Sequence, residues 1–334
     1  MAEYNIKEYL NRLFQKEVLT KQESKDILFE IGKGNVQAHQ TAALLTCYQM
    51  RPITGQELAG FRSAMIELCK KIEFASDDLI DIVGTGGDGK NTFNISTVTS
   101  FVVAGAGYKV AKHGNKGVSS PCGSSNVLEH LGYSFSNEFN KLKDDLDRSN
   151  FCFFHAPFFH PAMKEVVPIR KAMQVKTFFN VMGPLLNPAQ PKQQLSGVYH
   201  KSILPLYAQV FEEIGINFAV VYAHDGYEEI SLTGDFTIVN NNGSTTYRPE
   251  DIGFSTVKAE ELFGGNTVSE AADIFRSVLS GKGSEAQNNV VLANAAFAIQ
   301  CFNQNKSIEQ CISEARESLQ SGSAYQKLLL ATNT

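Results

Sequence analysis

Apolar residues recur every three or four positions from Met1 to about Lys71. This spacing places them on one face of successive short helices. Thr20 and Thr54 each stand three residues before a glutamate, which is the capping-box pattern of a helix start. We therefore expect a small helical domain over residues 1–73. Short amphipathic helices must cover their apolar faces, so we also expect part of this domain to pack on another subunit.

The pattern changes from about residue 74, where short apolar runs alternate with helical segments. This alternation predicts βα units and a mainly parallel sheet flanked by helices. Asn242-Gly243 lies between two further strand signals in Phe236–Arg248 and predicts a hairpin, while the C-terminal third is typical of a helical scaffold. We expect an α/β protein, with the large α/β domain over residues 74–334. The strand signals are Leu79–Val83, Tyr108–Ala111, Phe151–His155, Leu195–Tyr199 and Phe218–Ala223.

Composition narrows the class of protein further. The chain has 334 residues, 43% hydrophobic and 19% charged, which suits a globular enzyme with more than one core. Its net charge of −5 argues against a general nucleic-acid surface. The six cysteines lack metal-ligand spacing, and early charges such as Glu3 and Lys7 leave no room for an apolar leader. We expect a cytoplasmic protein that binds neither membranes nor nucleic acid.

Four glycines fall within six residues directly after the first predicted strand, from Gly84 to Gly89, and a helical pattern follows over Val98–Ala104. Glycines let backbone N–H groups face a ligand, and a helix start favours an anion. The spacing fits neither a P-loop nor a dinucleotide fingerprint. A plain glycine turn is the alternative to a phosphate site. The residues that we assign to this first cradle are Gly84, Gly87, Asp88, Thr92, Asn94, Ile95, Ser96 and Thr97.

A second candidate anion site follows the next predicted strand. Cations, glycines and hydroxyl groups at a strand end can together hold a phosphate. Two such sites on neighbouring strands indicate one ligand with phosphates at both ends. This second cradle comprises Lys112, His113, Gly114, Asn115, Lys116, Gly117, Val118, Ser119, Ser120 and Ser124.

The sequences GTGGDG with NTFNIST, KHGNKGVSS and HPAMKEVVPIRKAMQVKTFFNVMGPLLNPA resemble the anthranilate phosphoribosyltransferases. The motifs cover about Asp81 to Gly234. The resemblance implies a nucleoside phosphorylase/phosphoribosyltransferase-like fold in which residues 164–188 return to the helical domain, and a homodimer formed through that domain. It implies transfer of phosphoribosyl from phosphoribosyl pyrophosphate to anthranilate in tryptophan biosynthesis. A pyrimidine nucleoside phosphorylase and a non-catalytic, nucleic-acid-binding relative are the alternatives.

The resemblance also implies roles for individual residues. Both cradles bind phosphoribosyl pyrophosphate, while Gly84, Asn115 and Arg170 bind anthranilate, with Arg170 on its carboxylate. Ser96, Glu228 and Glu229 hold Mg²⁺, which we expect as two ions. No general base is expected, because an aromatic amine needs little activation, and His113 is either a base or an element of shape and hydrogen bonding.

Two positions depart from the family's pattern. Glu228 stands where the family has an aspartate, and Lys116-Gly117 replaces the usual Arg-Ser. We expect altered Mg²⁺ binding from the first change and weaker binding of the phosphoribosyl donor from the second.

Overall fold

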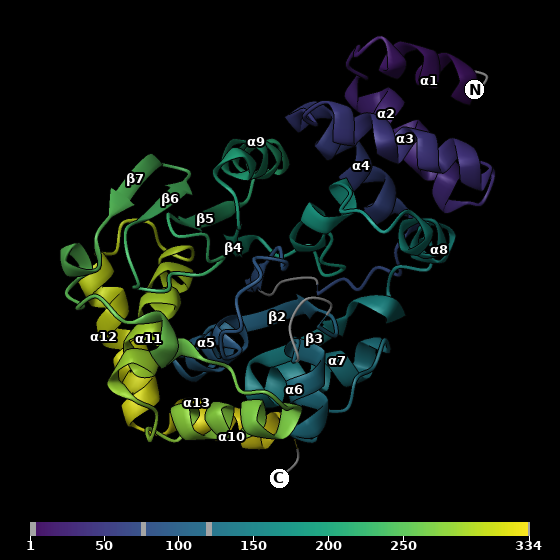
Figure 1. The fold of residues 1–334 in the computed structure, drawn as a ribbon. Helices are drawn as coiled ribbons and strands as arrows, with labels where there is room; N and C mark the ends of the chain where they lie inside the picture. The colour runs from purple at the N-terminus through teal and green to yellow at the C-terminus, as the bar shows by residue number, and fades with distance from the viewer. Residues whose placement is uncertain (1–4, 75–77, 118–121, 333–334) are drawn as a thin grey trace.

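The structure is a computed structural model that describes residues 5–74, 78–117 and 122–332 (Figure 1). Its N-terminal part is a bundle of four helices. A later helix, α8 (Met163–Met173), lies beside this bundle and packs against α2 and α3. The 3-10 turns that follow α8 contribute Phe178 and Met182 to the same apolar core. The four helices are α1 (Ile6–Phe14), α2 (Lys21–Gly32), α3 (Ala38–Met50) and α4 (Gly55–Leu68).

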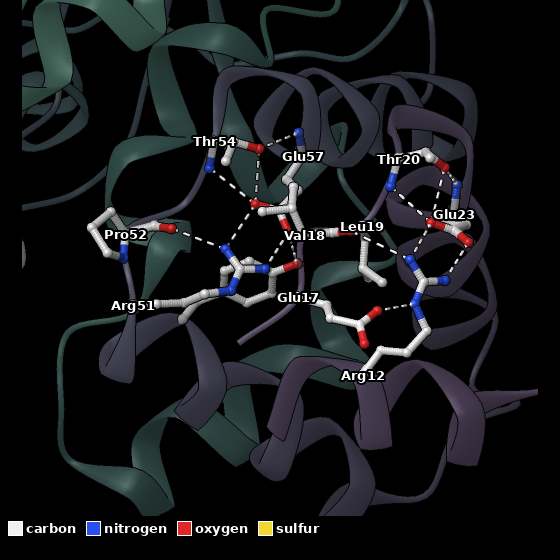
Figure 2. Close-up of polar contacts among 11 residues, drawn as sticks. Arg12, Glu17, Val18, Leu19, Thr20, Glu23, Arg51, Pro52, Thr54 and Glu57 are labelled. Carbon is white, nitrogen blue, oxygen red and sulfur yellow. Dashed lines mark hydrogen bonds and ion pairs between the residues drawn. The ribbon is translucent and has the colours of Figure 1, made fainter. Parts of the chain in front are cut away.

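A buried carboxylate organises the bundle (Figure 2). Glu57 is fully buried at the third position of α4, where it closes a capping box with Thr54 and pairs with Arg51. It also accepts hydrogen bonds from Leu19 N at 3.1 Å and Tyr48 OH at 3.0 Å. Burial raises the pKa of Glu57, but the hydrogen bonds from Arg51, Thr54 and Leu19 outweigh this and hold the pKa below its usual value. The charge is therefore matched by donors from several elements.

The rest of the chain is built on one seven-stranded sheet with the order β3-β2-β1-β4-β5-β6-β7. The pairs from β3 through β5 are parallel, and β5, β6 and β7 are antiparallel. Strand β1 lies between β2 and β4, so the connection from β3 must cross back over two strands to reach β4. The strands are β1 (Leu79–Gly84), β2 (Lys109–Gly114), β3 (Phe151–His155), β4 (Gln193–Gly197), β5 (Asn217–Ala223), β6 (Phe236–Asn240) and β7 (Gly243–Tyr247).

Helices cover this sheet, and α5 (Ile95–Gly105) is the most enclosed of those near the site. Nearly all of its residues are buried, since it packs against β1 and β2 as well as α11 and α13. Figure 1 shows α10 to α13 gathered beside α5. None of the helices in the described parts of the chain is long and apolar enough to cross a membrane. The remaining helices are α6 (Ser124–His130), α7 (Phe139–Ser149), α9 (Leu204–Ile214), α10 (Val268–Leu279), α11 (Glu285–Gln300), α12 (Ile308–Gln320) and α13 (Ser323–Thr332).

The expected fold class is confirmed, including the helical bundle, the mainly parallel sheet and the hairpin of β6 and β7. The boundaries of β4 were wrong, because the strand begins at Gln193 rather than Leu195 and ends before Val198. Two glutamines opening a strand look like loop residues in the sequence. In the fold, Gln194 is buried and donates to Pro184 O at 2.6 Å and Ser196 Oγ at 2.9 Å, which satisfies its amide.

Candidate active site

The candidate site lies where the strand order reverses, at the ends of β1 and β4. Gly84 and Gly197 are register partners at the ends of these two strands. Ligands of open α/β sheets bind at such a switch point, beyond the carboxyl ends of the strands. Three loops leave this edge: the glycine loop after β1, the second cradle after β2, and residues 224–234 after β5, which we call the acid loop.

The glycine loop has the geometry that an anion site requires. Gly87 has φ of +82°, in the left-handed region, and a Cβ placed there would meet only Lys176 Nζ at 3.7 Å. Gly84 is constrained differently, because a Cβ would lie 2.6 Å from the side-chain Cδ of Glu228. Glycine at these two positions keeps the backbone open to a ligand and lets the acid loop approach closely.

The rest of the first cradle forms the entry into α5. Asn94 is the N-cap residue, and its Nδ2 donates to Cys122 O at 3.0 Å, which links this cradle to the loop after β2. Ser96 lies in the first turn, where its Oγ accepts from Lys112 Nζ at 3.3 Å. Ile95 and Thr97 are buried, and their backbone N–H groups donate to Phe93 O at 2.5 Å and Asn94 O at 3.0 Å, so both residues support the turn.

Two buried ionisable side chains of opposite charge, Lys112 and Asp81, lie beneath both cradles. Lys112 is 1% exposed and donates through Nζ to Ile82 O, in addition to Ser96. Asp81 on β1 is also fully buried and accepts from His113 N at 3.0 Å. Burial lowers the pKa of Lys112 to about 8 and raises that of Asp81 to about 6, while each charge opposes the shift of the other. Both groups thus remain mainly charged at pH 7, with the ammonium held at the floor of the site.

The second cradle follows β2, and its described residues form the two ends of a loop. Asn126 Oδ1 accepts from Gly117 N at 2.9 Å and from Gly123 N at 3.1 Å, which joins those ends. Ser124 Oγ donates to Asn115 O at 3.3 Å. Lys116 is exposed, and its Nζ lies 3.1 Å from a carboxylate oxygen of Glu129 rather than toward the first cradle. Val118, Ser119 and Ser120 lie outside the described residues.

His113 is buried at the end of β2, with Gly114 directly after it. Its Nδ1 lies 3.2 Å from Gly183 O, and since a carbonyl can only accept, Nδ1 carries the proton. Burial lowers the pKa of His113 to about 3, assisted by the nearby His160 ring at 5.3 Å between centroids. A neutral imidazole of this low basicity favours the role in shape and hydrogen bonding over that of a base.

Three carboxylates meet across the glycine loop and the acid loop. Asp88, Glu228 and Glu229 each offer an oxygen within 4.8 Å of the others. Glu228 accepts from Thr85 Oγ1 at 3.0 Å and from Gly86 N, so its longer side chain reaches into the glycine loop. Burial, followed by the Asp88 charge, raises the pKa of Glu228 to about 7, and burial with the Glu228 charge raises that of Glu229. Such crowded carboxylates suit divalent cations, which would relieve their repulsion.

A cavity of about 480 Å³, large enough for a small molecule, lies between the end of the glycine loop and residues 259–263, and none of the three carboxylates lines it. Thr92 of the first cradle and Tyr227, the residue before Glu228, both line it. Lys90 lies on its wall with Nζ 4.6 Å from the centre of the Tyr227 ring.

Arg170 comes from the crossover between β3 and β4, near the end of α8. Its Nη2 donates to Asn180 Oδ1 at 3.0 Å, and its guanidinium lies over the Phe179 ring at 5.5 Å. Burial lowers its pKa, and Nε is buried with no hydrogen-bond partner within the described ranges. A partly desolvated guanidinium with an unused donor is suited to a carboxylate ligand.

The sequence analysis did not predict the contacts that two residues near the site, Asp88 and Lys176, make in the structure. Asp88 was assigned to the site of the phosphoribosyl donor, and its carboxylate also lies with those of the acid loop, as a candidate metal ligand that the sequence analysis did not name. Lys176 was not assigned, although its Nζ donates to Gly87 O at 3.0 Å. Asp88 precedes Glu228 by 140 residues in the chain, so only the strand order brings them together. The one signal in the sequence for Lys176 was a cation close to Arg170.

The sheet, its switch point and the helical bundle define a class, that of glycosyltransferases with a separate helical domain. A family model for the α/β domain of a glycosyl transferase family matches residues 76–325, and one for its helical bundle domain matches residues 7–69. The anthranilate phosphoribosyltransferase of Phocaeicola vulgatus is 51% identical, over 97% of this chain and 98% of that relative. That of Cytophaga hutchinsonii is 50% identical, over 96% and 98%.

Solved structures agree with these relatives. The anthranilate phosphoribosyltransferase of Thermus thermophilus superposes with a TM-score of 0.92 at 32% identity, covering 97% of this chain and 98% of that one. The Saccharomyces cerevisiae enzyme, in complex with PRPP and Mg, gives 0.89 at 28% identity, with 99% and 98% covered. The chain belongs to the anthranilate phosphoribosyltransferase family.

Proposed function

We propose that this enzyme transfers the phosphoribosyl group of 5-phosphoribosyl 1-pyrophosphate to the amine of anthranilate. The products are N-(5-phosphoribosyl)anthranilate and pyrophosphate, and the reaction belongs to tryptophan biosynthesis. The observation that carries the proposal is the meeting of the glycine loop with Asp88, Glu228 and Glu229 at the switch point, with Arg170 on the adjoining crossover. A pyrimidine nucleoside phosphorylase would not need this group of acids.

Binding of the phosphoribosyl donor is assigned to the two cradles. In the first, Gly84, Gly87 and the start of α5 would offer backbone N–H groups to phosphate, with Asp88, Thr92, Asn94, Ile95, Ser96 and Thr97 completing it. In the second, the buried Lys112 supplies charge from below, and the loop after β2 supplies further donors. The remaining residues of that assignment are His113, Gly114, Asn115, Lys116, Gly117, Val118, Ser119, Ser120 and Ser124.

Asp88, Glu228 and Glu229 fit a site for Mg²⁺, since their oxygens lie within 4.8 Å of one another. We retain the assignment of Ser96 and of two ions. When bound, Mg²⁺ would neutralise the pyrophosphate as it leaves. The acids themselves must be ionised to serve as ligands, so the raised pKa values of Glu228 and Glu229 make the site sensitive to competition by protons.

Anthranilate binding is assigned to Arg170, Asn115 and the backbone at Gly84. The Arg170 guanidinium would hold the carboxylate in a bidentate fork, which orients the amine toward the ribose. The C–O bond to pyrophosphate breaks as the amine attacks C1 of the ribose, with charge developing on the sugar and on the leaving group. Since His113 is neutral and weakly basic, we assign the rate enhancement to positioning and electrostatics without a general base.

We further propose that residues 1–73, with about 164–188, act as one domain and 74–334 as the other, and that the helical domain forms a homodimer. The support for a dimer is apolar surface on the bundle, where Met50 is 73% exposed and Phe14 is 61% exposed. Covering these side chains with a second copy would remove them from water. We place the enzyme in the cytoplasm, as a bacterial-type biosynthetic enzyme.

The test is a turnover assay with anthranilate and phosphoribosyl pyrophosphate. Loss of anthranilate fluorescence should accompany formation of equal amounts of pyrophosphate, and chelation of Mg²⁺ by EDTA should stop both. Readdition of Mg²⁺ should restore them. Release of free ribose phosphate without consumption of anthranilate, or no reaction with Mg²⁺ in excess, would overturn the proposal.

A further inference from the structure

A strap of chain, Gln174–Asn180, joins the end of α8 to the core of the helical bundle and touches the glycine loop. It starts where Gln174 ends α8 in the left-handed conformation, with φ of +55°. Phe178 anchors its far part in the apolar core of the bundle. Between these points Val175 and Lys176 are exposed, so this middle section is not held by burial.

Lys176 is the contact between the strap and the glycine loop. Its Nζ donates to Gly87 O at 3.0 Å and lies 4.9 Å from the centre of the Tyr199 ring. Gly87 lies in the glycine loop, whose neighbours Thr85 and Gly86 contact Glu228 of the proposed Mg²⁺ site. Because Mg²⁺ is proposed to neutralise the pyrophosphate, we assign this loop to the pyrophosphate end of the phosphoribosyl donor. An ammonium has three N–H donors, and Gly87 O uses one of them, so the others can face an anion in the loop.

Asn180, the last residue of the strap, contacts both Arg170 and the strap's own backbone. Asn180 Oδ1 accepts from Thr177 N at 2.8 Å and from Arg170 Nη2 at 3.0 Å. If a ligand drew the Arg170 guanidinium away from Asn180 Oδ1, the hydrogen bond from Thr177 N to the same oxygen would also be affected. Thr177 is the chain neighbour of Lys176. A continuous series of contacts runs from Arg170 through Asn180 and Thr177 to Lys176 and Gly87.

We propose that Lys176 is a positioning residue that couples occupancy of the acceptor site to the conformation of the pyrophosphate-binding loop. A carboxylate on Arg170 alters its hold on Asn180, and Lys176 transmits this to Gly87. By linkage, an anion in the glycine loop changes binding of the acceptor by the same factor as the acceptor changes binding of the anion. We take this factor to be favourable, because Lys176 offers its remaining N–H donors to an anion in the loop. The inference rests on the proposed function, because it takes anthranilate as the ligand of Arg170.

Calorimetric titration of anthranilate with and without Mg²⁺ and inorganic pyrophosphate tests the coupling, because this pair of ligands cannot react. In the parent enzyme, saturating pyrophosphate should tighten anthranilate binding by roughly fivefold or more, the low end of typical coupling energies. Lys176→Met should bring this factor close to one, while Lys176→Arg, which keeps charge and donors, should retain it. Lys171→Met, on the exposed side of α8, is the matched control and should behave as the parent.

Steady-state rates distinguish a positioning role from a structural one. Lys176→Met should abolish the dependence of the KM for anthranilate on the phosphoribosyl donor concentration, with an unchanged melting temperature. A parental coupling factor in Lys176→Met, or no coupling in the parent, would overturn the inference. Equal weakening of both ligands with the factor retained would also overturn it. Absence of turnover in the parent would instead refute the proposed function.

Discussion

Replacing Arg170 with alanine should weaken binding of anthranilate selectively. The guanidinium is partly buried, is unpaired with any carboxylate within the described residues, and has an unused Nε donor. A charge-assisted hydrogen bond in such a setting contributes about 1.5–3 kcal/mol. Since about 1.4 kcal/mol is a factor of ten, the KM for anthranilate should rise roughly 10- to 150-fold. The KM for the phosphoribosyl donor should change much less, because that ligand meets Arg170 only through the strap.

The assay is a pair of saturation curves, each with the other substrate in excess. Arg170→Lys keeps the charge but lacks the planar fork, so it should fall between the parent and Arg170→Ala. Lys171→Met, one residue further along α8, controls for a general change in local charge. Equal increases in both KM values for Arg170→Ala would refute the assignment, since a carboxylate clamp acts on one substrate only.

The glycine loop, the acids and the bundle each give a further prediction. Gly87→Ala must adopt φ near +82°, at a strain of about 1–2 kcal/mol, so calorimetric affinity for Mg²⁺-pyrophosphate should fall about 5- to 30-fold with an unchanged circular dichroism spectrum. An affinity equal to that of the parent would mean that the loop is a plain turn. Burial and neighbouring carboxylates raise the pKa of Glu228 to about 7 and also raise that of Glu229. Both must be ionised to bind metal, so Mg²⁺ affinity should fall as the pH falls from 8 to 6. A Mg²⁺ profile unchanged in both Glu228→Ala and Glu229→Ala would refute the metal assignment. Glu57→Ala leaves Arg51 buried without its partner and should lower the free energy of unfolding in urea by about 3–5 kcal/mol. The pKa of Glu57 is lowered in the folded state, so its contribution to stability is present above the unfolded pKa of about 4.3 and is lost as the pH falls through the folded pKa. The difference in unfolding free energy between Glu57→Ala and the parent should therefore shrink in acid. An equal difference at pH 7 and pH 3 would contradict this.

Local chemistry made much of this fold predictable. Glycines after a strand and caps such as Thr54 act within a few residues, so the sequence shows them directly. The stretch at Asn242-Gly243 was likewise readable as a hairpin. Asp81 could not be interpreted from the sequence alone. A carboxylate in a buried strand is explained only by its neighbours in the fold, which are Lys112 and the backbone N–H of His113.

The parts of the site that escaped prediction depend on contacts between distant segments. Asp88 meets Glu228 because β4 and β5 follow β1 in the sheet, and no spacing in the chain encodes that order. Lys176 meets Gly87 only because the crossover turns back over the sheet edge. The extra methylene of Glu228 was visible in the sequence, but its reach into the glycine loop to Thr85 was not. Long-range packing, rather than local propensity, fixes each of these pairs.

The connection from β3 to β4 has an evolutionary consequence. Because β4 pairs with β1 on the far side of β2, the chain needs a long excursion there, and Arg170 lies on that excursion rather than on the sheet. The glycine loop, in contrast, is bound to the strand framework at Gly84. If Arg170 binds the acceptor as proposed, substitutions on α8 could alter which nucleophile is accepted while the strands stay intact, provided that Lys176 keeps its contact with Gly87. A lineage could explore new aromatic amines by changing α8 alone, with its sugar-phosphate chemistry inherited unchanged.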